Sequence, residues 1–157
     1  MHIRRAAAAL ALLVLPVLLV PRLWCGRQSE ALFEGESGAA APLAREVALW
    51  METGVDASQF STGSSRFDGE WALGTHQMAL LGLGQAVLQQ PDLREELLPA
   101  MDAGATRLVE PSMRAFGTRA WGEDGLRALD SNNGHAYLGY LNLALGMHRL
   151  LEPESRF

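Results

Sequence analysis

Hydrophobic residues recur at helical spacing in four segments of the chain that follow residue 41. Residues 42–52 and 93–110 are apolar along one side only, which predicts amphipathic helices with one face in water. Residues 69–90 and 134–151 are apolar nearly all round, which is typical of helices in the interior of a domain. No segment alternates between apolar and polar residues for long enough to be a strand. We therefore expect an all-α domain over residues 42–157.

Two long polar connections separate these helices. Residues 55–68 are rich in Ser, Thr and Gly, and Asp68 at their end is expected to cap the helix that follows. Pro91 is expected to end that helix. Residues 111–133 form the second connection, in which we expect one short turn over residues 123–129. Each long connection therefore leads into one of the two strongly apolar helices.

Three glycines interrupt the first strongly apolar helix, at Gly74, Gly82 and Gly84. Each costs roughly 1 kcal/mol of helix propensity relative to alanine. This cost is understandable if neighbouring helices approach closely at these positions, because a glycine leaves room for the other backbone. We therefore expect tight helix packing at all three.

The helices repeat along the chain with an offset of 62 residues. At this offset Gly84 and Pro91 recur as Gly146 and Pro153. The repeating unit is an amphipathic helix, a long connection, an apolar helix and a short proline turn. Helical hairpins of this kind stack into toroids or solenoids, in which the apolar helix of each hairpin lies inside.

Two segments resemble the inner helices of α/α-toroid proteins. They are TGSSRFDGEWALGTHQMALLGLG, residues 62–84, and NGHAYLGYLNLALGMHRLLEPESRF, residues 133–157. The group includes glycan-processing hydrolases and epimerases and the linalool dehydratase-isomerase-like proteins. The resemblance covers about residues 42–157 and implies repeated helical hairpins, but it implies no particular reaction. A closed toroid needs about six hairpins, so we expect this chain to form a partial α/α toroid.

The N-terminal segment has the pattern of a targeting element. Arg4 and Arg5 are followed by an apolar run over residues 6–20. This run fits a secretory signal better than a full membrane span, which needs about 20 residues. Leu23 and Trp24 occupy places where a cleavage site has small residues, so an uncleaved signal-anchor remains equally open.

The segment boundaries follow from these patterns. Residues 1–25 are expected to be a signal peptide or signal-anchor, which makes the membrane a partner of the chain. Residues 26–41 lack periodicity and are expected to be a flexible tether. The two arginines favour the cytoplasmic side, so we expect the helical domain in the cell envelope, on the extracytoplasmic face of the membrane.

Charge and cysteine content exclude several classes of function. Residues 30–157 hold nine arginines against all 18 acidic residues, a formal charge of −9, which disfavours nucleic acid as a partner. The single cysteine, Cys25, excludes an internal disulfide and every zinc motif based on several cysteines. Because the chain also lacks nucleotide-binding and metal-binding motifs, we expect no cofactor and no metal.

The topology places candidate site residues at one end of the domain. If neighbouring helices alternate in direction, both strongly apolar helices begin at the same end, where both long connections lie. Aromatic rings, carboxylates and arginines at such an end are typical of sites that bind sugars or other polyols. The residues expected there are Arg66, Glu70, Trp71, Trp121, His135 and Tyr137.

These residues have ordinary structural interpretations beside the functional ones. Glu70 and His135 are the candidates for acid or base catalysis, but an acidic residue at position 70 also suits the first turn of a helix. Trp71 could cover the core rather than bind a ligand. His76 lies on the apolar stripe of its helix, so we expect a buried, hydrogen-bonded histidine rather than a general base.

Two classes of function follow for the helical domain. The first is binding or processing of a glycan or polyol-like ligand, and the residues leave open whether the protein is an enzyme. The alternative is a non-catalytic packing or interaction module, or a part of a larger toroid. Two apolar inner helices would leave a large exposed patch, so we also expect self-association or a partner chain that completes the toroid.

Overall fold

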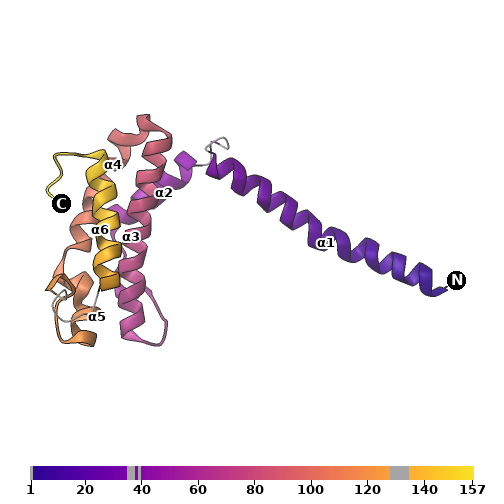
Figure 1. Ribbon diagram of the computed structural model, residues 1–157, viewed down its shortest axis with the longest axis horizontal. Helices are drawn as coiled ribbons and strands as arrows, with labels where there is room; N and C mark the ends of the chain where they lie inside the picture. The colour runs from indigo at the N-terminus through magenta and orange to yellow at the C-terminus, as the bar shows by residue number, and fades with distance from the viewer. Residues whose placement is uncertain (1, 35–37, 39, 128–134) are drawn as a thin grey trace. The chain divides into compact units, whose positions relative to one another are not determined.

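The computed structural model describes residues 2–34, 38, 40–127 and 135–157, and every regular element in this part of the chain is helical (Figure 1). The chain divides into two compact units, residues 1–40 and 41–157. The all-α prediction is therefore confirmed for the described residues.

The first unit consists mainly of α1 (His2–Phe33), which contains Pro16 and Pro21. This helix continues to Phe33, although we expected an irregular tether from residue 26 onwards. The segment includes Glu30 and Ala31, and the high helix propensity of both residue types favours continuation of the helix. Within the described residues, no helix combines the length and apolarity needed to cross a membrane.

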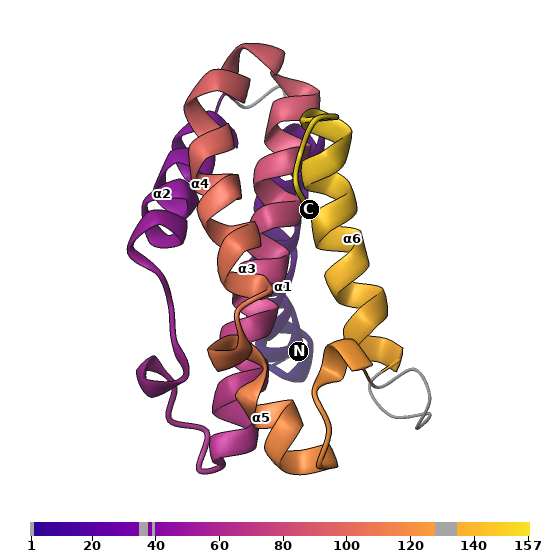
Figure 2. The ribbon, with the colours of Figure 1, turned by 90° about the vertical axis from the view of Figure 1, so that its left-hand side faces the viewer.

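The described residues of the second unit form five α-helices and three short 3₁₀ turns. Its elements are α2 (Ala40–Thr53), η1 (Ala57–Gln59), α3 (Ser65–Gln89), η2 (Pro91–Leu93), α4 (Arg94–Leu108), α5 (Pro111–Trp121), η3 (Gly125–Arg127) and α6 (His135–Leu151). The four predicted helices correspond to α2, α3, α4 and α6. The two strongly apolar helices, α3 and α6, run in the same direction, and α4 runs against both (Figure 2). Both therefore begin at one end of the unit, as the topology predicted.

Helix α3 is the centre of the second unit. It packs against α4, α5 and α6, and Leu80 and Leu83 on it are almost completely buried. Burying each such side chain stabilises the fold by roughly 1.5–3 kcal/mol. The other large residues of this core include Met51, Leu97, Met101, Leu108, Phe116 and Leu141.

Close helix contacts occur at some glycines and not at others. A side chain at Gly84 would overlap Met147 of α6, so the prediction of tight packing is confirmed there. Gly74 and Gly82 face open space, and for them the prediction is wrong. The chain also approaches α3 closely at Gly69, because a Cβ there would lie 2.7 Å from Cγ of Phe116. This glycine lets α5 approach α3.

Two local predictions need correction. The expected connection over residues 111–133 contains α5, which begins at Pro111 and ends before Gly122, a glycine in the left-handed conformation. Its buried side chains explain why this short segment is helical, since they include Phe116. The cap of α3 is Ser64 rather than Asp68. Asp68 lies in the first turn, where its carboxylate accepts hydrogen bonds from the backbone N–H and hydroxyl of Thr62.

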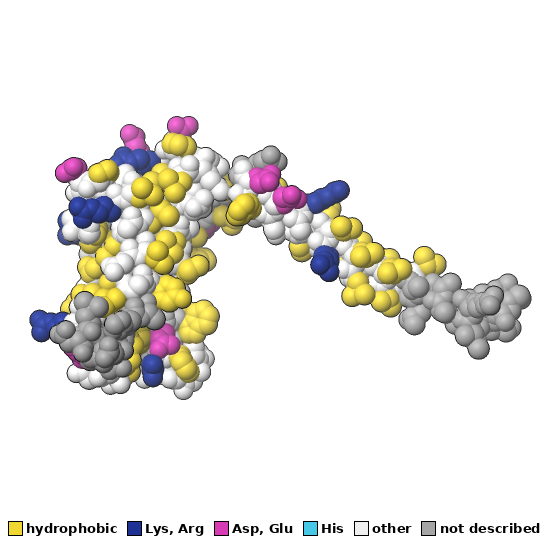
Figure 3. All heavy atoms as spheres, in the orientation of Figure 1, with side chains coloured by type: hydrophobic (Ala, Val, Ile, Leu, Met, Phe, Trp, Pro, Cys, Tyr) yellow, Lys and Arg dark blue, Asp and Glu magenta, His cyan; other side chains and the backbone are white. Residues whose placement is uncertain are grey.

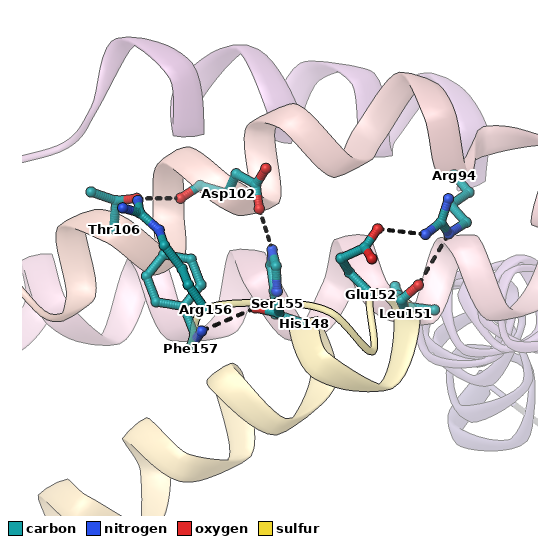
Figure 4. Close-up of polar contacts among 9 residues, drawn as sticks. All are labelled: Arg94, Asp102, Thr106, His148, Leu151, Glu152, Ser155, Arg156 and Phe157. Atoms are coloured by element: carbon teal, nitrogen blue, oxygen red, sulfur yellow. Dashed lines mark hydrogen bonds and ion pairs between the residues drawn. The ribbon is translucent and has the colours of Figure 1, made fainter.

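Polar contacts join α4 to the end of α6 (Figure 4). Arg94 donates hydrogen bonds to the Leu151 carbonyl at 3.1 Å and to the Glu152 carboxylate at 2.7 Å. The buried His148 contacts the carboxylate of Asp102 through Nε2. These bonds connect the two hairpins near the chain's C-terminus.

Candidate functional site

A cavity of about 400 Å³ opens between α3, α5 and α6. Each of the three helices contributes at least one aromatic or polar side chain to its wall. The lining residues are Glu70, Leu73, Gln77, Phe116, Trp121, Tyr137 and Tyr140.

Helix α3 supplies one wall of the cavity through side chains at positions i, i+3 and i+7. Glu70, Leu73 and Gln77 share a face of the helix because this spacing is close to whole turns. Seven residues correspond to about 10 Å along the helix axis, so Glu70 and Gln77 lie at different depths. Glu70 is partly exposed, and Arg66 donates a hydrogen bond to its carboxylate at 3.1 Å. Glu70 therefore lies near the mouth of the cavity.

Aromatic side chains form the facing wall. The rings of Phe116 and Trp121 meet edge to face with centroids 6.4 Å apart, and Trp121 and Tyr137 meet at 6.5 Å. Such contacts orient aromatic rings as well as burying them. The wall therefore presents a continuous apolar surface that joins α5 to α6.

An ion pair holds the end of α5 in place behind these rings. Arg114 is buried and donates to both carboxylate oxygens of Asp124, at 2.9 and 2.7 Å. It also donates to the backbone carbonyl of Val109. The hydrogen bonds from Arg114 and from the Leu126 N–H lower the pKa of Asp124 to about 2. The pair is therefore ionised at neutral pH and fixes the segment that carries Trp121.

Two polar atoms of the cavity wall are buried without a hydrogen-bond partner. Gln77 and Tyr137 are each 7% exposed, and neither Nε2 of Gln77 nor the hydroxyl of Tyr137 has a partner. Burial raises the pKa of Tyr137 to about 12, which outweighs the opposite effect of the nearby Arg114 charge. Tyr137 is therefore a neutral phenol that can donate a hydrogen bond at any physiological pH.

The structure brings three of the six predicted site residues into this cavity. Glu70, Trp121 and Tyr137 line it together although they come from three different helices. Arg66 lies outside the wall and reaches the site only through Glu70. His135 is the first residue of α6, but its side chain lies outside the described residues.

Trp71 lies elsewhere, which corrects the expectation that it shares a cleft with Glu70. It is 60% exposed and lines a separate groove of about 470 Å³ between α2 and α3. The reason is helical geometry, since adjacent residues point about 100° apart around a helix. The groove is lined by Val47, Trp50, Trp71, Gly74, Thr75, Met78 and Ala79.

The interpretation of His76 as a core residue is confirmed. Its side chain is completely buried, and Nδ1 donates a hydrogen bond to the Ala72 carbonyl at 2.9 Å. Burial lowers the pKa of His76, so the ring is neutral at neutral pH. His76 therefore belongs to the core rather than to the cavity.

The predicted site residues do not include Gln77, Phe116 or Tyr140, which also line the cavity. Gln77 could have been found from its spacing of seven residues from Glu70, which places both on one face of α3. Phe116 lies in α5, within the residues that were predicted to form the second long connection. Tyr140 shares a face with Tyr137 through its spacing of three residues.

Comparison with models of known protein families, with curated proteins and with solved structures found no match. The candidate site is therefore interpreted from its own geometry and chemistry.

Proposed function

We propose that the helical unit binds an uncharged polyol or glycan-like ligand in the cavity between α3, α5 and α6. The observation that carries this proposal is the combination of an aromatic wall with polar groups at two depths. A sugar ring has an apolar face that stacks on aromatic side chains and hydroxyls that bond to carboxylates and amides. The volume of about 400 Å³ lies in the range of small-ligand pockets.

Glu70 is the candidate for acid or base chemistry if the ligand is also processed. It is the one carboxylate among the described residues that line the cavity. His135 begins the helix that carries Tyr137, and it remains the proposed second catalytic residue. In the binding role, the Glu70 carboxylate accepts hydrogen bonds from ligand hydroxyls.

Titration with myo-inositol and with methyl glycosides of common hexoses tests the proposal. Binding is followed by NMR of the full chain, because four tryptophans would confuse a fluorescence signal. Glu70→Gln should weaken binding about tenfold, since a charged acceptor of hydrogen bonds is lost. Trp71→Phe should leave affinity unchanged, because Trp71 lines the other groove. Absence of binding to any of these compounds, or equal affinity of Glu70→Gln, would contradict the proposal.

The location of the protein is a separate part of this proposal. The arginine pair and the apolar run near the N-terminus support export of the helical unit to the extracytoplasmic side. Fractionation of cells that express the full chain with a C-terminal epitope tests this. Recovery of the epitope in the cytoplasm would contradict it.

A second candidate function is supported by the exposed apolar surface of α3 and α6. Figure 3 shows apolar side chains along the helical unit over these two helices. The large exposed ones are Phe67, Trp71, Met78 and Leu88 on α3 and Tyr140, Leu143 and Leu150 on α6. In a partial toroid this surface would be the inner face, and its exposure supports a packing module that another helical chain covers.

Cysteine cross-linking tests the second candidate against the first. Gly146→Cys in a Cys25→Ser background places the one thiol of the chain on α6, at an exposed position without neighbours within 4 Å. Cross-linked dimers formed under mild oxidation would support packing between copies. Asn142→Cys and Gln85→Cys serve as further positions on the exposed sides of α6 and α3.

A further inference from the structure

Two unpartnered polar groups point to how the cavity recognises its ligand. Nε2 of Gln77 and the hydroxyl of Tyr137 are buried without a partner, and both side chains line the same cavity. Leaving a buried donor unpaired costs stability, and native proteins generally avoid it unless the group has another role. The two groups come from different helices, α3 and α6, so the fold brings both to the wall of one cavity.

We infer that Gln77 and Tyr137 form a two-donor subsite that binds an oxygen atom of an uncharged ligand inside the cavity. This inference rests on the proposed function and specifies the ligand group that the site recognises. The side-chain nitrogen of glutamine only donates hydrogen bonds, so it needs an acceptor. The phenol of Tyr137 donates to the same kind of atom. Both a hydroxyl oxygen and a carbonyl oxygen meet this requirement.

The charges around the cavity disfavour an anionic ligand. Glu70 places a carboxylate near the mouth, which repels an anion. Among the described lining residues there is no cation. The nearby arginines are already engaged, Arg66 by Glu70 and Arg114 by Asp124. A carboxylate or phosphate ligand would therefore lose its hydration without gaining an opposite charge.

The geometry also gives the ligand an orientation. Gln77 lies about two turns further along α3 than Glu70, about 10 Å. Phe116 and Trp121 form the apolar wall of the same cavity. The bound molecule is therefore expected to have polar groups at opposite ends and an apolar face between them. Its inner oxygen contacts Gln77 and Tyr137, and its outer hydroxyls contact Glu70.

Two variants that preserve side-chain shape test whether these groups are functional or structural. Gln77→Leu and Tyr137→Phe remove the unpartnered groups and keep most of the packing. In the full chain without ligand, the melting temperature should stay the same or rise. A fall of several degrees in either variant would show that the group supports the fold, for example through a bound water, and would overturn the inference.

Binding measurements with three probes complete the test. The probes are myo-inositol, which offers only hydroxyls, δ-gluconolactone, which adds a carbonyl, and gluconate, which is charged. Each variant should bind the uncharged probes at least tenfold more weakly than the natural chain, and the natural chain should bind gluconate most weakly. Preference for one of the two uncharged probes identifies the oxygen as a hydroxyl or a carbonyl.

A matched control is Gln85→Leu, which makes the same change as Gln77→Leu at an exposed glutamine of α3 that does not line the cavity. Its affinity should change less than twofold. If the natural chain binds the probes and the two variants bind them equally well, the inference is overturned and the proposed function stands. If the natural chain binds none of the probes, both are overturned. Tighter binding of gluconate than of the uncharged probes would also overturn the inference.

Discussion

At the scale of single residues, the buried histidine of α3 makes stability depend on pH. Burial lowers the pKa of His76 below 6.5, so the unfolded chain binds a proton at mildly acidic pH before the folded chain does. The contribution of neutral His76 is therefore complete above about pH 6.5 and is lost as the pH falls through the lower pKa of the folded state.

This linkage predicts a difference between the natural chain and His76→Gln. The melting temperature of the natural chain should fall between pH 7 and pH 5, and that of the variant should fall less, because glutamine does not titrate. Thermal unfolding followed by circular dichroism at several pH values measures both. Parallel pH profiles of the two proteins would show that His76 does not carry the effect.

The ion pair of Arg114 and Asp124 is expected to contribute more to the free energy of unfolding than His76 does. Asp124→Ala would leave the buried guanidinium of Arg114 without its counter-charge, which costs about 3 kcal/mol. Urea unfolding at pH 7 measures this loss. The same pair predicts acid sensitivity: because the pKa of Asp124 is about 2 in the fold, its contribution is present above about pH 4 and is lost as the pH falls towards 2.

A control for this prediction is Asp56→Ala in the exposed turn η1. The Asp56 carboxylate caps η1 by accepting a hydrogen bond from the Ser58 N–H at 2.7 Å. Loss of such a cap costs roughly 1 kcal/mol. If Asp124→Ala lowers the free energy of unfolding no more than Asp56→Ala does, Arg114 finds another partner or reaches water in the variant.

Residue types alone predicted part of the candidate site. Glu70, Trp121 and Tyr137 stood out because carboxylates and aromatic rings after a long connection suggest ligand binding. Gln77 did not stand out, because a neutral amide within an apolar helix resembles an ordinary exposed position. Its importance depends on burial and on Tyr137 being nearby, and neither can be derived from the sequence.

At the scale of helices, the close approach of α5 to α3 depends on Gly69. An added Cβ there would meet Cβ and Cγ of Phe116, which are near the backbone and cannot move aside as the end of a flexible side chain can. Gly69→Ala is therefore expected to destabilise the fold by about 1–3 kcal/mol through overpacking. It should also weaken ligand binding, because Phe116 forms a wall of the cavity.

Gly82→Ala is the matched control for this change. Gly82 lies in the same helix and has no neighbouring atom within 4 Å, so alanine should stabilise the helix by about 0.5–1 kcal/mol. Chemical denaturation of both variants measures how each substitution changes the free energy of unfolding. Equal and favourable effects at both positions would mean that α5 can shift without cost.

Whether a helix could be predicted depended on its length and on the pattern of its apolar residues. Helices α2, α3, α4 and α6 have long apolar stripes, so their existence followed from the sequence. Helix α5 has only 11 residues and includes Gly117 and Thr118, which weaken the helical signal. Its remaining signals were Pro111 at the start and Gly122 after the end. Packing of Phe116 against α3, which the sequence does not show, stabilises it.

At the scale of the whole helical unit, the expected alternation of neighbouring helices predicted the common direction of the two apolar helices. Figure 2 shows α3 and α6 beginning at the same end, and the candidate cavity includes residues from the first half of α3 and the first turns of α6. The repeat did not predict which rotation each helix adopts about its axis. That rotation decides that Glu70 rather than Trp71 faces the cavity, and it is set by side-chain packing between the helices.

The same unit leaves an apolar face open, and this predicts association. Leu143 is 59% exposed, and Met78 is 69% exposed, whereas a soluble monomer rarely exposes a large continuous apolar patch. The fragment of residues 41–157 contains the whole core of the unit, so we expect it to fold and to self-associate in a concentration-dependent way. Leu143→Gln should shift the equilibrium towards monomer, because it places a polar group in the contact. Sedimentation velocity at several concentrations measures the shift.

The matched control for association is Leu126→Gln. Leu126 is also exposed, but it lies in η3, outside the row of apolar residues on α3 and α6, so its replacement should leave the monomer fraction unchanged. Equal effects of Leu126→Gln and Leu143→Gln would indicate nonspecific aggregation. A fragment that stays monomeric at all concentrations and melts cooperatively would contradict the prediction, because the open face would then be stable in water.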